Sequence, residues 1–270
     1  MKFRVLGSLS TISETVTKPV EGARQRTLLA LLLISPKNVV TKDQFFEELW
    51  RDKLPGAPDN ALQAIVARVR KVLASEFGED FTRINLVTHP HGYSLDVEPD
   101  QVDAHVFSSL TAEAEARAHL HPEAARDLLD RALGLWQGSA LQGVSGGLIC
   151  ESAATQLEEM RLSAIEARIR LSIEISGHAS VISELKRMTS LYPWREQLSE
   201  LLMISLYRTG RQAEAIEAYN HLRRRLVDGF GLEPSQNLTK CMMAVLRQDP
   251  GLGEPTRNTV HKKAVTALAR

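Results

Sequence analysis

A run of basic and small residues between positions 60 and 71 has the composition expected of a surface that binds a polyanion. Apolar residues recur there at spacings of three and four, which predicts a helix over about 59–73. Its outward residues would be Asn60, Gln63, Ala64, Ala67, Arg68, Arg70 and Lys71. No acidic residue occurs from Asn60 to Ser75, so these cations would meet a polyanion without competing carboxylates.

The same residue types could read the edges of nucleic-acid bases. Glutamine can pair bidentately with adenine and arginine with guanine, which suggests these roles for Gln63 and Arg68. The small side chains of Ala64 and Ala67 would let the helix backbone approach a base edge. An ordinary solvated helix face explains the same residues equally well, so this helix alone does not decide between the two interpretations.

The elements around this helix give it a context. Alternating residues over 3–20 predict short strands, and the leucine-rich stretch 24–34 predicts a helix that is buried on all sides. Thr41 with Gln44 forms a capping-box signature for a second helix. A hairpin is predicted over 84–97, with its turn at 89–92. This order of elements is that of a winged helix-turn-helix, whose third helix lies in the major groove and whose hairpin, the wing, lies beside it.

The predicted wing supplies His89, His91 and Tyr93 as further candidate DNA contacts. The Tyr93 hydroxyl could bond a phosphate, or its ring could pack against the third helix, and both interpretations stay open. The pairs His89/His91 and His119/His121 could also suggest a metal. Zinc needs three or four ligands, and no cysteine or acidic cluster adjoins either pair, so we expect no metal.

From residue 102 onward the patterns predict helices only. They fall at about 103–119, 122–136, 150–176, 178–191, 195–208, 211–228 and 235–247. Tyr207, Gly210, Ala215 and Tyr219 resemble a tetratricopeptide unit, whose small residues allow close helix packing. An irregular bundle is the alternative, because a solenoid usually needs several units.

We therefore expect a mixed fold of two domains, which suits the length of 270 residues. Residues 1–98 would form an α+β winged helix-turn-helix domain, and residues 99–248 an all-α, tetratricopeptide-like domain. Residues 249–270 hold glycine, proline and threonine and, after Glu254, only basic charges, which predicts a disordered tail.

Composition limits the classes of protein. The 33 basic and 33 acidic residues give a formal net charge of zero, so attraction for a polyanion must come from a local patch. The longest apolar run, residues 28–34, is far shorter than the about 20 residues that cross a bilayer. Cys150 and Cys241 lie far apart on apolar helical patterns, typical of core residues rather than of a disulfide. With no signal peptide expected either, we predict a cytoplasmic protein.

No enzyme, cofactor or nucleotide motif is expected. Gly143-Val144-Ser145-Gly146-Gly147 matches a nucleophile-elbow pattern, but that motif needs a preceding strand, and a helix is predicted there. A hydrolase using Ser145 remains an alternative that a generic esterase assay would test. Neither a P-loop lysine motif nor a strand-helix GxGxxG is present.

Short motifs in both halves, taken in order, resemble the Streptomyces antibiotic regulatory proteins. Those similar to the OmpR-type winged helix are Phe3-Arg4-Val5-Leu6-Gly7, Arg24-Gln25-Arg26, Glu48-Leu49-Trp50, Arg68-Val69-Arg70-Lys71 and Gly92-Tyr93. Those similar to the bacterial transcriptional activation domain are Val102-Asp103-Ala104 with Phe107, Leu135-Trp136-Gln137-Gly138, the stretch from Tyr207 to Ala215, and Gly231-Leu232-Glu233-Pro234. The resemblance covers about residues 1–250 and is carried by the order of the motifs.

The resemblance implies an activator of an antibiotic biosynthetic gene cluster, located in the cytoplasm with the nucleoid. It would bind direct repeats in double-stranded DNA, as a homodimer or as tandem protomers, and recruit RNA polymerase through the sigma factor and the C-terminal domain of the α subunit. The implied DNA contacts are the outward residues of the third helix and the wing, together with Arg24 and Arg26. The implied polymerase contacts are Asp52, Lys53, Leu54 and Pro55.

One position departs from the family. Many relatives carry arginine at the wing tip, where this chain has His89, and a neutral histidine would weaken a minor-groove contact. A tetratricopeptide-like adaptor without direct DNA readout is the alternative function.

Overall fold

The chain begins with a small antiparallel sheet. A computed structural model describes residues 2–13, 16–51, 53–77 and 85–253. The strands of this sheet, in the order β1-β2-β3, are β1 (Phe3–Arg4), β2 (Ser10–Ile12) and β3 (Thr17–Pro19). Phe3 is fully buried and pairs with Thr11, so the sheet forms part of the core rather than a free N-terminal arm.

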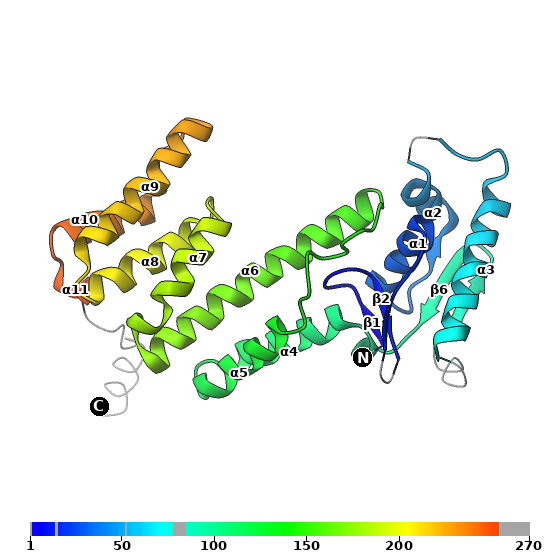
Figure 1. Cartoon of the computed structure of the whole chain (residues 1–270), viewed down its shortest axis with the longest axis horizontal. Helices are drawn as coiled ribbons and strands as arrows, with labels where there is room; N and C mark the ends of the chain where they lie inside the picture. The colour runs from blue at the N-terminus through cyan, green and yellow to red at the C-terminus, as the bar shows by residue number, and fades with distance from the viewer. Residues whose placement is uncertain (1, 14–15, 52, 78–84, 254–270) are drawn as a thin grey trace, which may run out of the picture. The chain divides into compact units, whose positions relative to one another are not determined.

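The predicted winged helix follows (Figure 1). Its elements are α1 (Ala23–Ile34), β4 (Val40–Thr41), α2 (Lys42–Leu49), α3 (Pro58–Phe77), β5 (Asn85–His89) and β6 (Gly92–Asp96). The second sheet has the order β4-β6-β5 and is antiparallel throughout. The short strand β4 was not predicted, because two residues carry no periodicity.

Local sequence signals account for the helix boundaries. Helix α1 is buried from Thr27 to Leu33, as its all-round apolar pattern predicted. The capping box of α2 is confirmed: Thr41 Oγ1 accepts from the Gln44 amide, and Gln44 Oε1 accepts from the Thr41 amide. Helix α3 continues one turn beyond the predicted end at residue 73, because Phe77 is buried there.

The wing is a tight hairpin fixed to the body of the domain. His89 pairs with Gly92, which leaves Pro90 and His91 as the turn. A Cβ at Gly92 would collide with the carbonyl oxygen of Val40, so only glycine lets β4 approach β6. The Arg70 guanidinium also ties the wing to α3. It donates to the Leu86 carbonyl at 2.7 Å and to the Thr88 hydroxyl at 2.8 Å.

The helical region is joined to the winged helix by a continuous core and by buried polar contacts. It starts with η2 (Pro99–Gln101), α4 (Asp103–Arg117), α5 (Pro122–Leu133) and α6 (Leu148–Ser176). The Asp103 carboxylate is fully buried and accepts the amides of Val5 at 2.7 Å and Leu6 at 3.0 Å. Burial raises the pKa of this carboxyl, and the two backbone donors oppose that rise.

Glu48 makes the second such contact. It lies at the end of α2, is 3 % exposed, and caps the N-terminus of α6. Its carboxylate accepts the amides of Gly147 and Ile149, each at 2.7 Å, and of Cys150 at 3.3 Å. These are amides that a helix leaves without intrahelical partners, so a carboxylate at this end is favourable.

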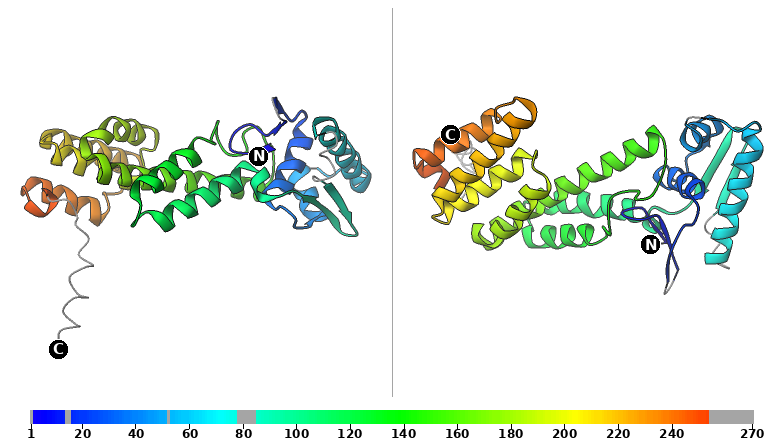
Figure 2. Two further views of the ribbon diagram at one scale, coloured as in Figure 1. Left: turned by 90° about the horizontal axis from the view of Figure 1, so that it is seen from below. Right: turned by 45° about the horizontal axis from the view of Figure 1, so that its top comes forward.

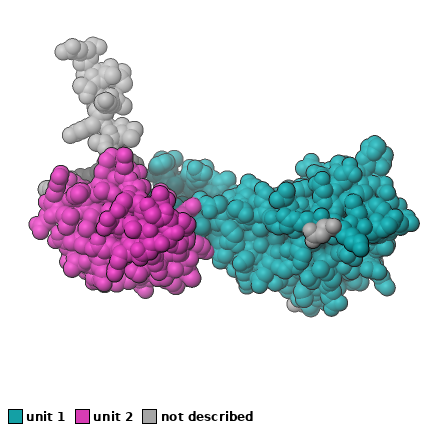
Figure 3. Space-filling model, turned by 90° about the horizontal axis from the view of Figure 1, so that it is seen from above, with its two compact units in different colours: residues 1–171 teal, residues 172–270 magenta. Residues whose placement is uncertain are grey.

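The structure divides into two compact units, residues 1–171 and 172–270 (Figure 3). Within the first unit, the α4–α5 pair runs alongside α6 in the ribbon views (Figures 1 and 2), and an Arg168–Asp130 ion pair joins α6 to α5. The division falls within α6 rather than after residue 98, because one core includes the winged helix, α4, α5 and much of α6. A functional boundary after residue 98 stays a prediction.

The second unit is helical throughout its described part. After the end of α6 its elements are η3 (His178–Val181), α7 (Ile182–Leu191), α8 (Glu196–Arg208), α9 (Gln212–Phe230), α10 (Gln236–Leu246) and α11 (Pro250–Gly253). Helix α9 ends at Gly231, whose left-handed φ of 66° suits glycine. The fold class, a winged helix followed by a helical domain, is confirmed.

Other expectations concern single residues and the tail. Cys150 and Cys241 are free and buried, as predicted for core residues. Among the described residues, no helix is both long and apolar enough to cross a membrane. Of the tail predicted to be disordered, residues 249–270, most lies outside the described residues, whereas residues 250–253 form the short helix α11.

Replacing Glu48 with alanine should lower the free energy of unfolding by about 2–3 kcal/mol, because buried amides of α6 lose a charged acceptor. The exposed neighbour Glu47 is the matched control, and Glu47→Ala should change stability by no more than about 0.5 kcal/mol. Urea unfolding of both variants measures the difference. Equal stability of the two variants would show that the cap is unimportant.

Arg70→Ala should destabilise the chain by about 1–2 kcal/mol, since the wing loses its hydrogen bonds to α3. Lys71→Ala, one position along the same helix but exposed, should stay within about 0.5 kcal/mol of the parent. Thermal unfolding compares the two. A Lys71 variant as unstable as the Arg70 variant would contradict this assignment.

Candidate nucleic-acid interface

Helix α3 presents a continuous exposed stripe. Its members, all exposed, are Asn60, Gln63, Ala64, Ala67, Arg68 and Lys71. They recur at helical spacing, so they lie on one face, opposite the buried Leu62, Ile65, Val66 and Val69. The small side chains of Ala64 and Ala67 leave the middle of the stripe low, with longer polar side chains around them. A duplex groove could therefore approach the backbone of α3 there.

Both acidic residues of α3 are neutralised by cations from other elements. At the start of the helix, Asp59 pairs with Lys42 at 2.6 Å, and this hydrogen bond raises the pKa of Lys42. Near its end, Glu76 pairs with Lys18 at 3.1 Å. Within the described part of the chain, neither Arg68 nor Lys71 has a carboxylate partner, so the stripe keeps its positive charge.

A hollow beside the stripe brings Arg24 and Arg68 together. It has a volume of about 570 Å³ and lies between the N-terminus of α1 and the face of α3. The Arg24 guanidinium lies 5.6 Å from the centre of the Trp50 ring, which supports the side chain at the edge of the hollow. Gln25, Trp50 and Ala61 also line it. Gln25 and Trp50 belong to motifs quoted for the resemblance, but they were not chosen as contacts.

Two of the predicted DNA-contact residues form hydrogen bonds within the protein itself. Arg70 donates to the wing, and Arg26 donates to the carbonyls of Gly143 at 2.8 Å and Val20 at 3.2 Å. Both residues are half-buried. They hold main-chain segments next to α1 and α3, whereas Arg24, Arg68 and Lys71 are exposed.

The wing residues differ in their exposure. His91 is exposed in the turn, and His89 is half-buried, with its Nε2 2.8 Å from the Ser94 hydroxyl. Tyr93 is 5 % exposed, and its ring lies edge-on to that of Phe45, with centroids 6.0 Å apart. The ring of Tyr93 therefore packs on α2, whereas the packing interpretation had placed it against the third helix.

The loop between α2 and α3 is mostly exposed in its described part. Lys53 and Leu54 are exposed and Pro55 is half-buried, whereas Asp52 lies outside the described residues. Leu54 is 54 % exposed, so the loop offers apolar surface to a partner.

The alternative chemistries find little geometric support. Ser145 lies in the loop that precedes α6, without the preceding strand that a nucleophile elbow needs. In the described ranges, no group of three or more histidine, cysteine or acidic side chains is arranged to hold a metal ion.

Family models match both parts of the chain. Residues 20–95 match "Transcriptional regulatory protein, C terminal", and residues 102–246 match "Bacterial transcriptional activator domain". A solved structure of Mycobacterium tuberculosis EmbR in complex with a low-affinity phosphopeptide superposes with a TM-score of 0.83 at 29 % identity. That match covers 92 % of this chain and 65 % of the EmbR chain.

Several Streptomyces regulators are similar over nearly the whole chain. The transcriptional regulator RedD of Streptomyces coelicolor is 35 % identical, over 95 % of this chain and 73 % of its own length. The regulatory protein DnrI of Streptomyces peucetius is 32 % identical, over 93 % of this chain and 94 % of its own length. The regulatory protein AfsR of Streptomyces griseus is 35 % identical, but the chain spans only 25 % of it. With both domains matched in order, the chain belongs to the Streptomyces antibiotic regulatory protein family of transcriptional activators.

Proposed function

We propose that this chain activates an antibiotic biosynthetic gene cluster by binding double-stranded DNA sequence-specifically at the promoter and recruiting RNA polymerase. The observation that carries the proposal is the acid-free stripe of α3, with Arg68 and Lys71 exposed and unpaired among the described residues. A helix of this kind suits the major groove, where base edges present distinct donors and acceptors. Residues 1–98 would bind DNA, and residues 99–248 would serve activation.

The exposed side chains take direct roles in this proposal. Gln63 and Arg68 read base edges, while Asn60 and Lys71 contact the adjoining sugar-phosphate backbone of the DNA. Arg24 meets a phosphate at the edge of the hollow, because the α1 N-terminus beside it has no side-chain cap and no acidic residue in its first turn. The His91 side chain at the wing tip contacts the DNA backbone next to the groove that holds α3.

The half-buried or buried residues take indirect roles. Arg70 and Arg26 hold the wing and the loop around Gly143 in place, so they position the reading helix. Tyr93 and His89 fix the wing through Phe45 and Ser94. Their removal should weaken DNA binding through the shape of the domain rather than through a lost contact.

The arrangement of the DNA site follows from the reader being a single helix and wing. One protomer covers one half-site, so tandem protomers on direct repeats about 10–10.5 base pairs apart would lie on one side of the duplex. Cytoplasmic location with the nucleoid follows from this function. The loop with Lys53, Leu54 and Pro55 is the proposed contact for the sigma factor or for the C-terminal domain of the α subunit, because it leaves Leu54 exposed.

Arg68→Ala should cost about 1–3 kcal/mol of binding to the specific site and reduce discrimination at one base position. Lys71→Ala should weaken binding to all sequences alike and lower the salt slope by about one. Arg131→Ala, an exposed cation on α5, is the control and should leave affinity unchanged. Fluorescence anisotropy with promoter fragments at several salt concentrations measures all three. Unaltered affinity in the Arg68 variant would remove that residue from the reading face.

Leu54→Ala should reduce transcription from the target promoter several-fold without changing affinity for the promoter DNA. The expectation rests on the loss of exposed apolar surface that a polymerase subunit would bury against this loop. Val39→Ala, another exposed apolar residue of the first unit, is the matched control. Run-off transcription with purified polymerase, alongside anisotropy, separates the two effects. If both variants transcribe like the parent, the loop is not a polymerase contact.

A further inference from the structure

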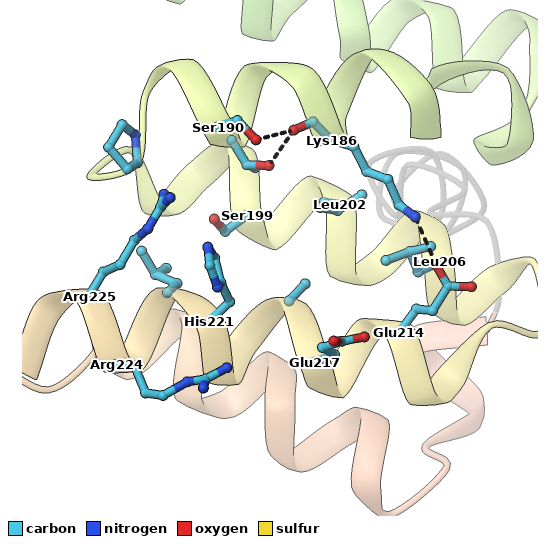
Figure 4. A pocket seen from close by; sticks show the side chains of 14 residues that line it. Lys186, Ser190, Ser199, Leu202, Leu206, Glu214, Glu217, His221, Arg224 and Arg225 are labelled. Atoms are coloured by element: carbon cyan, nitrogen blue, oxygen red, sulfur yellow. Dashed lines mark hydrogen bonds and ion pairs between the residues drawn. The ribbon is translucent and has the colours of Figure 1, made fainter.

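A groove in the second unit lies between α9 and the pair α7–α8 (Figure 4). Its floor is apolar, made by the buried Leu202, Leu206 and Leu222. Its volume is about 320 Å³, at the low end of the roughly 300–1,000 Å³ typical of ligand pockets. Polar side chains form its walls, and its position in the second unit is separate from the DNA-reading residues of α3.

At one end of the groove, the charged side chains are paired with one another. Glu214 pairs with Lys186 across the groove at 2.8 Å and with Arg211, the residue just before α9, at 2.7 Å. The hydrogen bonds from Arg211, and then from Lys186, hold the pKa of Glu214 at about 2. The charges at this end are therefore satisfied within the protein, and it offers little to a ligand.

The other end carries cations that are not matched by acids. His221 and Arg225 extend from α9 toward α7 in Figure 4, and Arg224, which also lines the groove, runs along α9. Arg224 donates only to the Asn220 carbonyl, at 3.3 Å, and among the described residues neither Arg224 nor Arg225 pairs with a carboxylate. Glu217 is the one acid among the residues that line the groove besides Glu214. This end therefore favours an anionic ligand.

Exposed aromatic residues continue from the cationic end. Pro193 also lines the groove, and Trp194 follows it directly in sequence. Trp194 is 49 % exposed and Phe230 is 59 % exposed, yet their rings contact each other, with centroids 4.7 Å apart. An exposed pair of large aromatic rings beside a charged groove is typical of a protein interaction surface.

We propose that this groove binds a short acidic segment of a partner protein. Carboxylates of the segment would pair with Arg224 and Arg225, and an apolar side chain would cover the leucine floor or the Trp194–Phe230 pair. Charge complementarity selects this occupant. The chain's own residues 254–270 carry basic charges and a single acid, Glu254, so they do not suit the cationic end. This surface is independent of the DNA-binding proposal.

The test uses the full chain and two fluorescein-labelled peptides. One is made of glutamate, serine and glycine with a central leucine, and the other has lysine in place of every glutamate. Fluorescence anisotropy should detect binding of the acidic peptide, weakening with salt, and none of the lysine peptide. Arg225→Glu should weaken binding by about tenfold or more, whereas Arg225→Lys should retain most of it.

Lys240→Glu is the control, because it makes the same change of charge on α10, away from the groove, at an exposed position. It should bind the acidic peptide like the parent, and circular dichroism should show equal helix content in every variant. Equal binding of both peptides, or an Arg225→Glu variant that binds like the parent, would overturn the proposal. Self-association of the parent that disappears in the Arg225→Glu variant would also overturn it, by assigning the groove to a second copy of the chain.

Discussion

The buried carboxylate of Glu48 is the contact on which the geometry of the first unit depends. Glu48 belongs to α2 of the winged helix, and its carboxylate accepts hydrogen bonds from amides 99 to 102 positions later, at the start of α6. A carboxylate leaves water at a high cost unless donors replace the lost hydration, so its partners are fixed in place. Asp103 likewise links α4 to the segment after β1, because its carboxylate accepts the Val5 amide. The winged helix is therefore held in a body that extends to α4 and α6.

The cations near the proposed interface divide into two groups by what they touch. Arg26 and Arg70 direct their planar guanidiniums at main-chain carbonyls, a geometry that suits several parallel hydrogen bonds. Arg68 and Lys71 have no such acceptor in the described structure and extend into solvent. Arg24 is intermediate, since it rests on Trp50. One set of side chains thus builds the surface, and the other is left free to bind a ligand.

Much of the fold could be predicted because its signals are local. The helices of the second half follow from apolar spacing, and the start of α2 follows from Thr41 and Gln44. The role of Glu48 could not be predicted, since its partners are distant in sequence and its own neighbourhood resembles an ordinary helix end. Helical periodicity predicted that Arg70 faces outward, and this holds for the position of its Cα on α3. Its long side chain, however, turns toward the wing and donates to the Leu86 carbonyl. The hollow at Arg24 depends on how α1 meets α3, which no pattern within either helix specifies.

Because the winged helix is joined to α6, it cannot easily be separated from the helical region of the chain. Cutting the chain after residue 98 would remove every amide that Glu48 accepts, together with the carboxylate that holds Val5 and Leu6. Phe3 and its neighbours would lose part of their cover. The winged helix is thus not a detachable module, and natural recombination of such chains should favour exchange points beyond residue 171 rather than points between the winged helix and α6.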